Sequence, residues 1–326
     1  MSQLDLFGPP PSEAADDLGA VYAEASRLAA RIDPRIRFGT SSWSFPGWRG
    51  IVYSSSVSRT ALAREGLREY ARHPLLRTVG IDRSFYAPIP DDDLRRYADQ
   101  LPDGFLACAK AGASVTSAVR HGSREAALEP NPDFLAPGVF IEEMLVPVAR
   151  HFRRFAGPFV LEFSPLPRGV RIAAAEFLEG LDRFLAALPS EFRYAVELRE
   201  RSWLTSAYAE ILTRHGASHV YNYWSAMPMP LEQARVVPPE SLRQAVVRLL
   251  LPPGTRYEQQ REAFRPFDRI QAPDPVMRRQ VVEIAQRSVG RGSDVFVLVN
   301  NKAEGSSPLT VMEIARLLHS DRTPGQ

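Results

Sequence analysis

Charged side chains close several short apolar runs of this sequence. Asp82, Lys110, Arg199 and Arg248 each stand at or near the end of such a run. Arginine and lysine suit carboxylate or phosphate groups, and a carboxylate suits general acid–base chemistry. We therefore predict that Lys110, Arg199 and Arg248 converge on one anion site. Asp82 is the candidate acid–base carboxylate, and Lys110 is a candidate substrate-orienting cation or base.

Two glutamates offer a structural alternative for these cations. Glu197 lies two residues before Arg199, and Glu162 belongs to the preceding apolar run. A charge inside an apolar strand is costly unless it is paired. A Glu–Arg network across adjacent strands therefore explains these residues as well as catalysis does, and we expect Glu197 to be a buried ion-pair partner.

Lysine is nearly absent from the chain. Among 40 basic residues only Lys110 and Lys302 are lysines. Lysine can lose its proton and arginine cannot, so these two positions are candidates for a role that arginine does not fill. The alternative is chance survival of two surface lysines. For Lys302, which follows Asn300 and Asn301, a site position and a solvated loop position are equally expected.

Aromatic residues follow several apolar runs. Such rings suit stacking on a sugar or a base, although loop packing explains each one singly. The substrate-binding candidates are Trp43, Tyr86, Arg199, Trp203, Arg248, Asn300 and Asn301.

No metal or cofactor site is predicted. The six histidines show no metal-ligand spacing, and His121 lies in a long loop where it is free to swing over a site. Cys108 lies within an apolar run and is expected to be an inert core thiol. No Gly-rich phosphate or dinucleotide fingerprint follows a strand.

The runs that carry these residues alternate with amphipathic segments. Eight candidate strands are expected at 36–40, 76–82, 104–109, 158–163, 193–198, 218–223, 245–251 and 294–299. Helices are expected at 59–73, 91–101, 139–155, 173–188, 206–215, 276–289 and 306–319. This alternation predicts an α/β fold, a TIM-like (β/α)8 barrel over 35–320 with functional loops at its C-terminal face. A helix over 13–34 and a flexible tail over 1–12 precede it.

Composition excludes several classes of protein. The 326 residues carry a formal net charge of +2, which is too balanced to suggest direct nucleic-acid binding. No apolar stretch is long enough for a membrane span, and the first residues lack the pattern of a signal peptide. With one cysteine, these features predict a cytoplasmic protein without a disulfide framework.

Taken together, the strand ends resemble the domain-of-unknown-function 72 family, the YecE-like proteins. The resemblance rests on the block Gly39–Phe45, on Thr78–Tyr86, on Arg199-x-x-Ser202-Trp203 and on Asn300–Asn301. It covers about residues 36–320 and implies a TIM barrel without an established reaction.

The chain departs from the family pattern at five positions. The resemblance implies Glu at position 80, Asn at 82 and His at 117, whereas this chain has Gly80, Asp82 and Ser117. The strand-seven pattern Arg-Leu-His-Gly is replaced by the residues Arg248–Leu251. Asp82 is expected to replace the lost acid; otherwise this branch has different chemistry or none.

Two functional hypotheses follow. The first is an enzyme-like barrel that binds a small anionic, sugar- or nucleotide-like ligand, with hydrolase or isomerase chemistry. The second is a non-catalytic adaptor. Gln3, Leu4, Leu6 and Phe7 match the short peptide by which replication and repair proteins bind the DNA polymerase sliding clamp, and a proline-rich spacer follows them.

Overall fold

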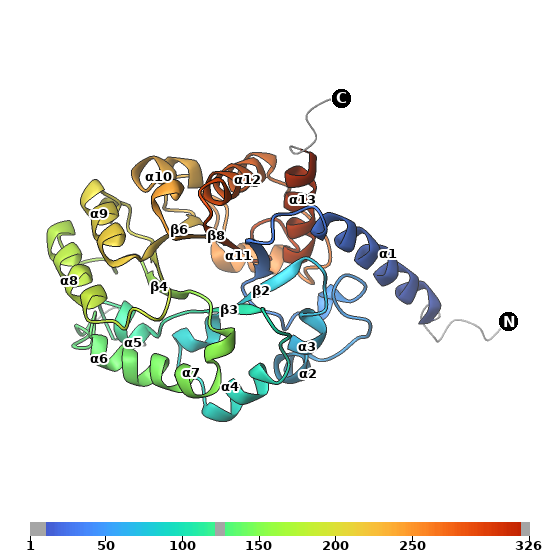
Figure 1. The fold of residues 1–326 in the computed structure, drawn as a ribbon, viewed down its shortest axis with the longest axis horizontal. Helices are drawn as coiled ribbons and strands as arrows, with labels where there is room; N and C mark the ends of the chain where they lie inside the picture. Colours follow the sequence, from blue (N-terminus) through green and yellow to red (C-terminus); the bar gives the residue numbers. More distant parts are fainter. Residues whose placement is uncertain (1–10, 121–127, 321–326) are drawn as a thin grey trace.

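The computed structural model describes residues 11–120 and 128–320, and its centre is a parallel eight-stranded sheet closed into a barrel (Figure 1). The strand order is β3-β2-β1-β8-β7-β6-β5-β4. Parallel bridges Ala107–Ala156 and Lys110–Val160 join β3 to the β4 side and close the ring. The strands are β1 Ile36–Thr40, β2 Leu76–Ile81, β3 Leu106–Ala109, β4 Phe159–Phe163, β5 Tyr194–Leu198, β6 Ser218–Tyr223, β7 Gln244–Leu249 and β8 Asp294–Val299. The predicted α/β barrel is confirmed.

Helices surround the strands, as Figure 1 shows. They are α1 Pro11–Ala29, α2 Arg59–Glu65, α3 Leu67–Tyr70, α4 Asp91–Ala98, α5 Ala113–Thr116, α6 Pro137–Phe140, α7 Val146–His151, α8 Ala174–Ala186, α9 Ser206–His215, α10 Pro230–Val236, α11 Tyr257–Ala263, α12 Pro275–Gly290 and α13 Ser307–Ser320. None of the helices in this described part is long and apolar enough to cross a membrane.

Local chemistry determines where several helices begin. Ser58, Thr205 and Asp274 each accept a hydrogen bond from a backbone N–H in the first turn of α2, α9 and α12. Such caps satisfy donors that the helix itself leaves free. Gly216 ends α9 in the left-handed region, with φ of 61°, which glycine adopts without strain.

The structure corrects three of the predicted helices and adds others. The segment 59–73 is two helices, α2 and α3, that meet at Gly66. The segment 139–155 contains a π-helical turn, Ile141–Leu145, before α7, where Pro147 has no N–H for the regular helical bond. The helices α5, α10 and α11 were not predicted, and the N-terminal helix ends at Ala29 rather than at 34.

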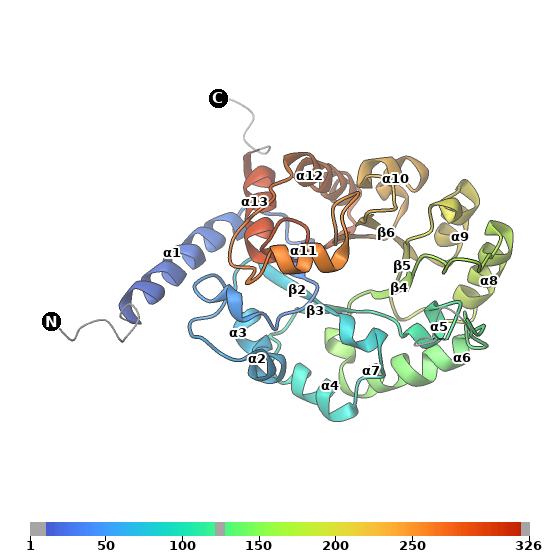
Figure 2. The ribbon, with the colours of Figure 1, turned by 180° about the vertical axis from the view of Figure 1, so that it is seen from behind.

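The N-terminal helix α1 packs beside α13, at the edge of the barrel (Figure 2). Arg316 of α13 donates to Glu24 at 2.8 Å, and the Tyr22 ring meets the buried His73 ring edge-on. The candidate clamp-binding residues Gln3–Phe7 lie outside the described residues, as does His121.

Apolar side chains fill the barrel interior below the charged residues. They are Cys108, Val160, Ala195, Val220, Val246, Phe296 and Leu298. Cys108 is fully buried there, and burial raises the pKa of its thiol to about 12, as expected for an inert core thiol. The barrel is therefore closed below, and its polar residues lie toward the carboxyl ends of the strands.

Candidate functional site

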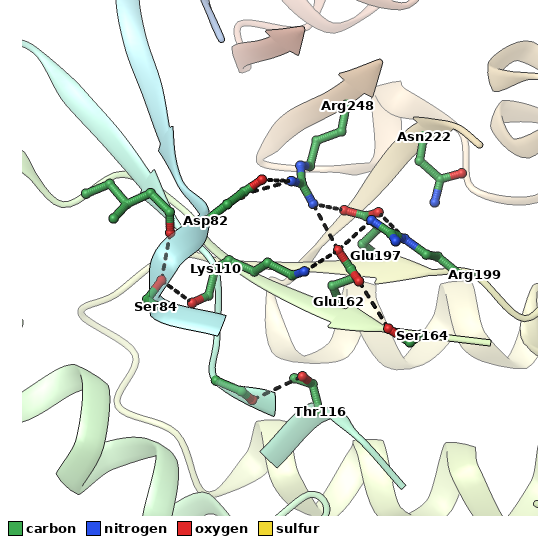
Figure 3. Close-up of polar contacts among 12 residues, drawn as sticks. Asp82, Ser84, Lys110, Thr116, Glu162, Ser164, Glu197, Arg199, Asn222 and Arg248 are labelled. Atoms are coloured by element: carbon green, nitrogen blue, oxygen red, sulfur yellow. Dashed lines mark hydrogen bonds and ion pairs between the residues drawn. The ribbon is translucent and has the colours of Figure 1, made fainter. Parts of the chain in front are cut away.

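Six charged side chains form a layer inside the barrel near the carboxyl ends of the strands (Figure 3). We call them the ion-pair layer: Asp82, Lys110, Glu162, Glu197, Arg199 and Arg248. Alternation along each strand turns these positions inward. Glu162 and Glu197 are paired in register on β4 and β5, which brings their carboxylates together. The three cations therefore meet at the barrel top, as the sequence predicts.

Each cation of this layer has at least one carboxylate partner. Lys110 Nζ lies 2.7 Å from Glu162 Oε2, and Arg199 contacts the same oxygen at 2.5 Å. Arg199 Nε also donates to Glu197 Oε1 at 2.9 Å. Arg248 donates to Glu197 and contacts Glu162 Oε2 at 3.4 Å. Three cations thus face three carboxylates, including Asp82.

Burial and charge shift the proton affinity of this layer. Burial opposes ionisation of Glu162, but Arg199, Lys110 and Arg248 outweigh it and lower its pKa to about 2. Burial lowers the pKa of Lys110, partly offset by Glu162. Burial likewise acts against charged Arg248, while its three carboxylate neighbours raise its pKa. The layer is an internally neutral network, so its cations do not offer a free anion site.

Asp82 is the member of the layer nearest to solvent. Arg248 NH2 donates to both of its carboxylate oxygens at 3.0 Å. The Asp82 side chain is 35% exposed, whereas the Glu162 and Glu197 side chains are almost fully buried. Asp82 therefore links the buried network to the space above it.

That space is a cavity of about 480 Å³ above β1, β2 and β8, which we call the mouth cavity. Helix α11 and the segment that follows it form one wall, and Figure 2 shows α11 lying across the barrel opening. Its polar and aromatic lining includes Ser41, Trp43, Arg59, Asp82, Arg83, Tyr86, Tyr257, Arg261, Arg265, Asn300, Asn301 and Lys302.

Lys302 is a buried cation in this lining. It is 8% exposed, its Nζ donates to Asn300 Oδ1 at 2.8 Å, and it lies 4.1 Å from the centre of the Tyr257 ring. Among the described residues no carboxylate lies within 4.0 Å of the ammonium group. Burial lowers the pKa of Lys302 to about 8, and the nearby charge of Asp82 partly opposes that shift.

Two neutral groups of the lining also lack a partner. Ser41 Oγ and Asn301 Nδ2 are buried without a hydrogen-bond partner among the described residues. Asn301 Oδ1, in contrast, accepts from Ser307 N at 2.8 Å and from Trp48 Nε1 at 3.2 Å, which holds the amide in place at the start of α13. Ten buried side-chain polar atoms of the described residues lack a partner, and three of them, Ser41 Oγ, Arg261 Nε and Asn301 Nδ2, belong to residues that line this cavity.

Comparison with known proteins identifies the family. Residues 37–325 match the family model described as "Protein of unknown function DUF72". The chain belongs to this family. A DUF72 family protein from Thermotoga maritima, solved at 2.20 Å, has 17% identity and a TM-score of 0.60, covering 87% of this chain and 99% of that one. One from Enterococcus faecalis, solved at 2.52 Å, has 15% identity and a TM-score of 0.55, covering 89% and 98%. No curated protein matches the sequence.

In this DUF72 barrel, two departures from the family pattern have local reasons. A Cβ atom at Gly80 would lie 3.0 Å from Ser41 Cα, so a larger residue there requires the backbone just after β1 to shift by a few tenths of an ångström. Asp82 accepts two bonds from Arg248 with two oxygens, which an asparagine would not do.

Most of the residues predicted from the aromatic and amide pattern line the mouth cavity. Trp43, Tyr86, Asn300 and Asn301 all do so, together with Asp82. Lys110, Arg199 and Arg248 lie outside the lining, in the ion-pair layer. The substrate-binding role predicted for the two arginines is thus replaced by ion pairing.

The structure places Trp203 away from the mouth cavity. Its ring is 1% exposed and stacks on Phe177 of α8 with 3.8 Å between ring centres, and its Nε1 donates to Ile172 O. The 3-10 turn Arg201–Trp203 directs it against the helix layer. Within the described residues, no group of three or more His, Cys, Asp or Glu side chains is arranged to hold a metal.

Proposed function

We propose that the mouth cavity binds a small anionic ligand of sugar- or nucleotide-like size at the C-terminal face of the barrel. The observation that carries this proposal is Lys302, a buried ammonium group that lines the cavity without a carboxylate partner among the described residues. Removing a cation from water without a counter-ion is costly. A ligand with negative charge removes that cost when it binds.

The excess positive charge of the lining also favours an anionic ligand. Arg59, Arg83, Arg261, Arg265 and Lys302 face one carboxylate, Asp82. The partners of three of these arginines, Asp93, Glu258 and Glu262, lie outside the lining. The pairs of Arg261 with Glu258 and of Arg265 with Glu262 are exposed and therefore worth little, so these two arginines can turn toward a bound anion at small cost.

The remaining lining favours a ligand with a ring. Tyr86 is 72% exposed and Tyr257 45% exposed, and both line the cavity. Exposed aromatic faces at a cationic cavity suit stacking on a sugar or a base. Ser41 Oγ and Asn301 Nδ2 supply hydrogen bonds to hydroxyl or phosphate oxygens. Asp82 is the acid–base group that hydrolysis or isomerisation needs at such a site.

Inorganic phosphate tests this proposal through thermal stability. At a concentration ten times its Kd, phosphate stabilises by about 1.4 kcal/mol, or roughly 2 °C in Tm for a chain of this length. We expect Arg261→Gln to weaken that stabilisation. Arg95→Gln is the matched control, because Arg95 makes the same kind of i,i+3 pair on α4 away from the cavity. Equal stabilisation of all three proteins, or none, contradicts the proposal.

A further inference from the structure

The two lysines of the chain have opposite surroundings. Lys110 Nζ is bound to Glu162 at 2.7 Å and lies 3.5 Å from the centre of the Phe85 ring, away from the mouth cavity. Lys302 lines the cavity, and among the described residues its ammonium group donates a hydrogen bond to the neutral Asn300 Oδ1 and has no carboxylate partner. Lys302 is therefore the amine of this barrel that meets a ligand without first giving up an ion pair.

We propose that Lys302 is a nucleophilic amine that forms a Schiff base with an anionic aldehyde or ketone bound in the mouth cavity. This inference rests on the proposed function and narrows its ligand to carbonyl compounds. An arginine at position 302 supplies the same charge but not this reaction, since a guanidinium stays protonated. Apart from Lys110 and Lys302, every Lys or Arg position of this chain is arginine. The ability to lose a proton therefore gives position 302 a chemical reason to be lysine.

The geometry favours such a reaction. The β8–α13 loop that carries Lys302 is held from both sides: Asn301 binds the first residue of α13, and Glu304 binds Arg278 at 2.9 Å. The Tyr257 ring and Asn300 Oδ1 fix the position of the amine. A held amine beside a cavity reacts faster than a mobile one, because its orientation is already set. Burial lowers its pKa to about 8, so a useful fraction is neutral near neutral pH.

The reaction balances with groups already in the cavity. The ammonium group of Lys302 gives up a proton, and Asp82, the carboxylate of the lining, accepts it. The amine nitrogen then adds to the carbonyl carbon, and a nitrogen-bound proton moves to the oxygen to give a carbinolamine. The first proton returns to the hydroxyl group, which leaves as water while the C=N bond forms. One water is released, nothing is oxidised, and the iminium keeps the positive charge of Lys302.

Reductive trapping on the intact protein tests the inference. The probes are pyridoxal phosphate, an anionic aromatic aldehyde, and pyridoxal, which lacks the phosphate. After borohydride reduction and digestion, we expect the label on Lys302 to exceed that on Lys110 by about tenfold or more, with more label from the phosphorylated probe. Labelling of Lys302 should rise through pH 8 and fall when inorganic phosphate is added.

The controls separate this inference from the proposed function. Lys302→Arg keeps the charge and should lose the label while it keeps phosphate stabilisation. Labelling of wild-type protein that spares Lys302, or that phosphate does not reduce, overturns the Schiff-base inference. Because phosphate protection is measured on the wild type, the inference stays testable even if the variant does not fold. Phosphate stabilisation without Lys302 labelling overturns this inference alone, and labelling of Lys302 without phosphate stabilisation contradicts the proposed function.

Discussion

Replacing Glu197 by glutamine should destabilise the protein much more than replacing Asp82 by asparagine. Glu197 is fully buried and accepts from both Arg199 and Arg248, so its loss leaves an excess positive charge inside the barrel. Breaking a buried pair in this way costs about 3–5 kcal/mol. Asp82 is partly solvated, and asparagine keeps one of its two acceptors for Arg248, so that change should cost about 1 kcal/mol.

Thermal melts convert these energies into measurable shifts. At ~2.1 cal/mol/K per residue, a chain of 326 residues unfolds with an entropy of ~0.7 kcal/mol/K, so 1 kcal/mol corresponds to ~1.5 °C. We expect Tm to fall by roughly 4–7 °C for Glu197→Gln and by roughly 1–2 °C for Asp82→Asn. Glu179→Gln is the control, because Glu179 forms an exposed i,i+4 pair with Arg183 on α8. A larger loss for Asp82→Asn than for Glu197→Gln would show that the two carboxylates have exchanged roles.

Three further outcomes are expected. Burial lowers the pKa of His73 to about 4, so the unfolded chain binds more protons between pH 6.5 and 4 and stability falls as pH falls through that window. His73→Asn, followed by chemical denaturation at each pH, should flatten this dependence by about 3 kcal/mol, and an unchanged slope would contradict the assignment. Gly39→Ala should prevent folding or cost well above 3 kcal/mol, because a Cβ atom there would lie 2.0 Å from a carbonyl oxygen of β2; a near-normal melt would show that the strands separate freely. We also propose, as a separate role, that a peptide of residues 1–12 binds a bacterial sliding clamp with micromolar-range affinity, about 8 kcal/mol, and that changing Leu6 and Phe7 to alanine abolishes binding in calorimetry.

The barrel itself could be predicted because its pattern is strongly periodic. Every predicted strand lies within two residues of the observed one at either end, and the shared face of Glu197 and Arg199 follows from alternation alone. The helix boundaries were less predictable where one residue changes the backbone, as Gly66 does between α2 and α3 and Pro147 does in the first turn of α7.

The site was only partly predictable, because sequence position does not reveal pairing or direction. Arg199 and Arg248 stand where ligand-binding cations stand, yet the carboxylates of Glu162 and Glu197 neutralise them. Trp203 follows a strand as Trp43 does, but a 3-10 turn directs it outward onto α8. The sequence signal that pointed to the mouth cavity was the scarcity of lysine. It singled out Lys110 and Lys302 without showing which of the two lacks a carboxylate partner.

The most direct test of the account is the position of a bound oxyanion. Crystals soaked in tungstate, a heavy analogue of phosphate, give an anomalous signal that locates the anion without any assumption about the reaction. We predict a peak in the mouth cavity, within reach of Lys302 Nζ, Ser41 Oγ and Asn301 Nδ2. A peak within the ion-pair layer, on Arg248 in place of Asp82, or a mouth cavity that stays without a peak while the anion binds elsewhere, would contradict it.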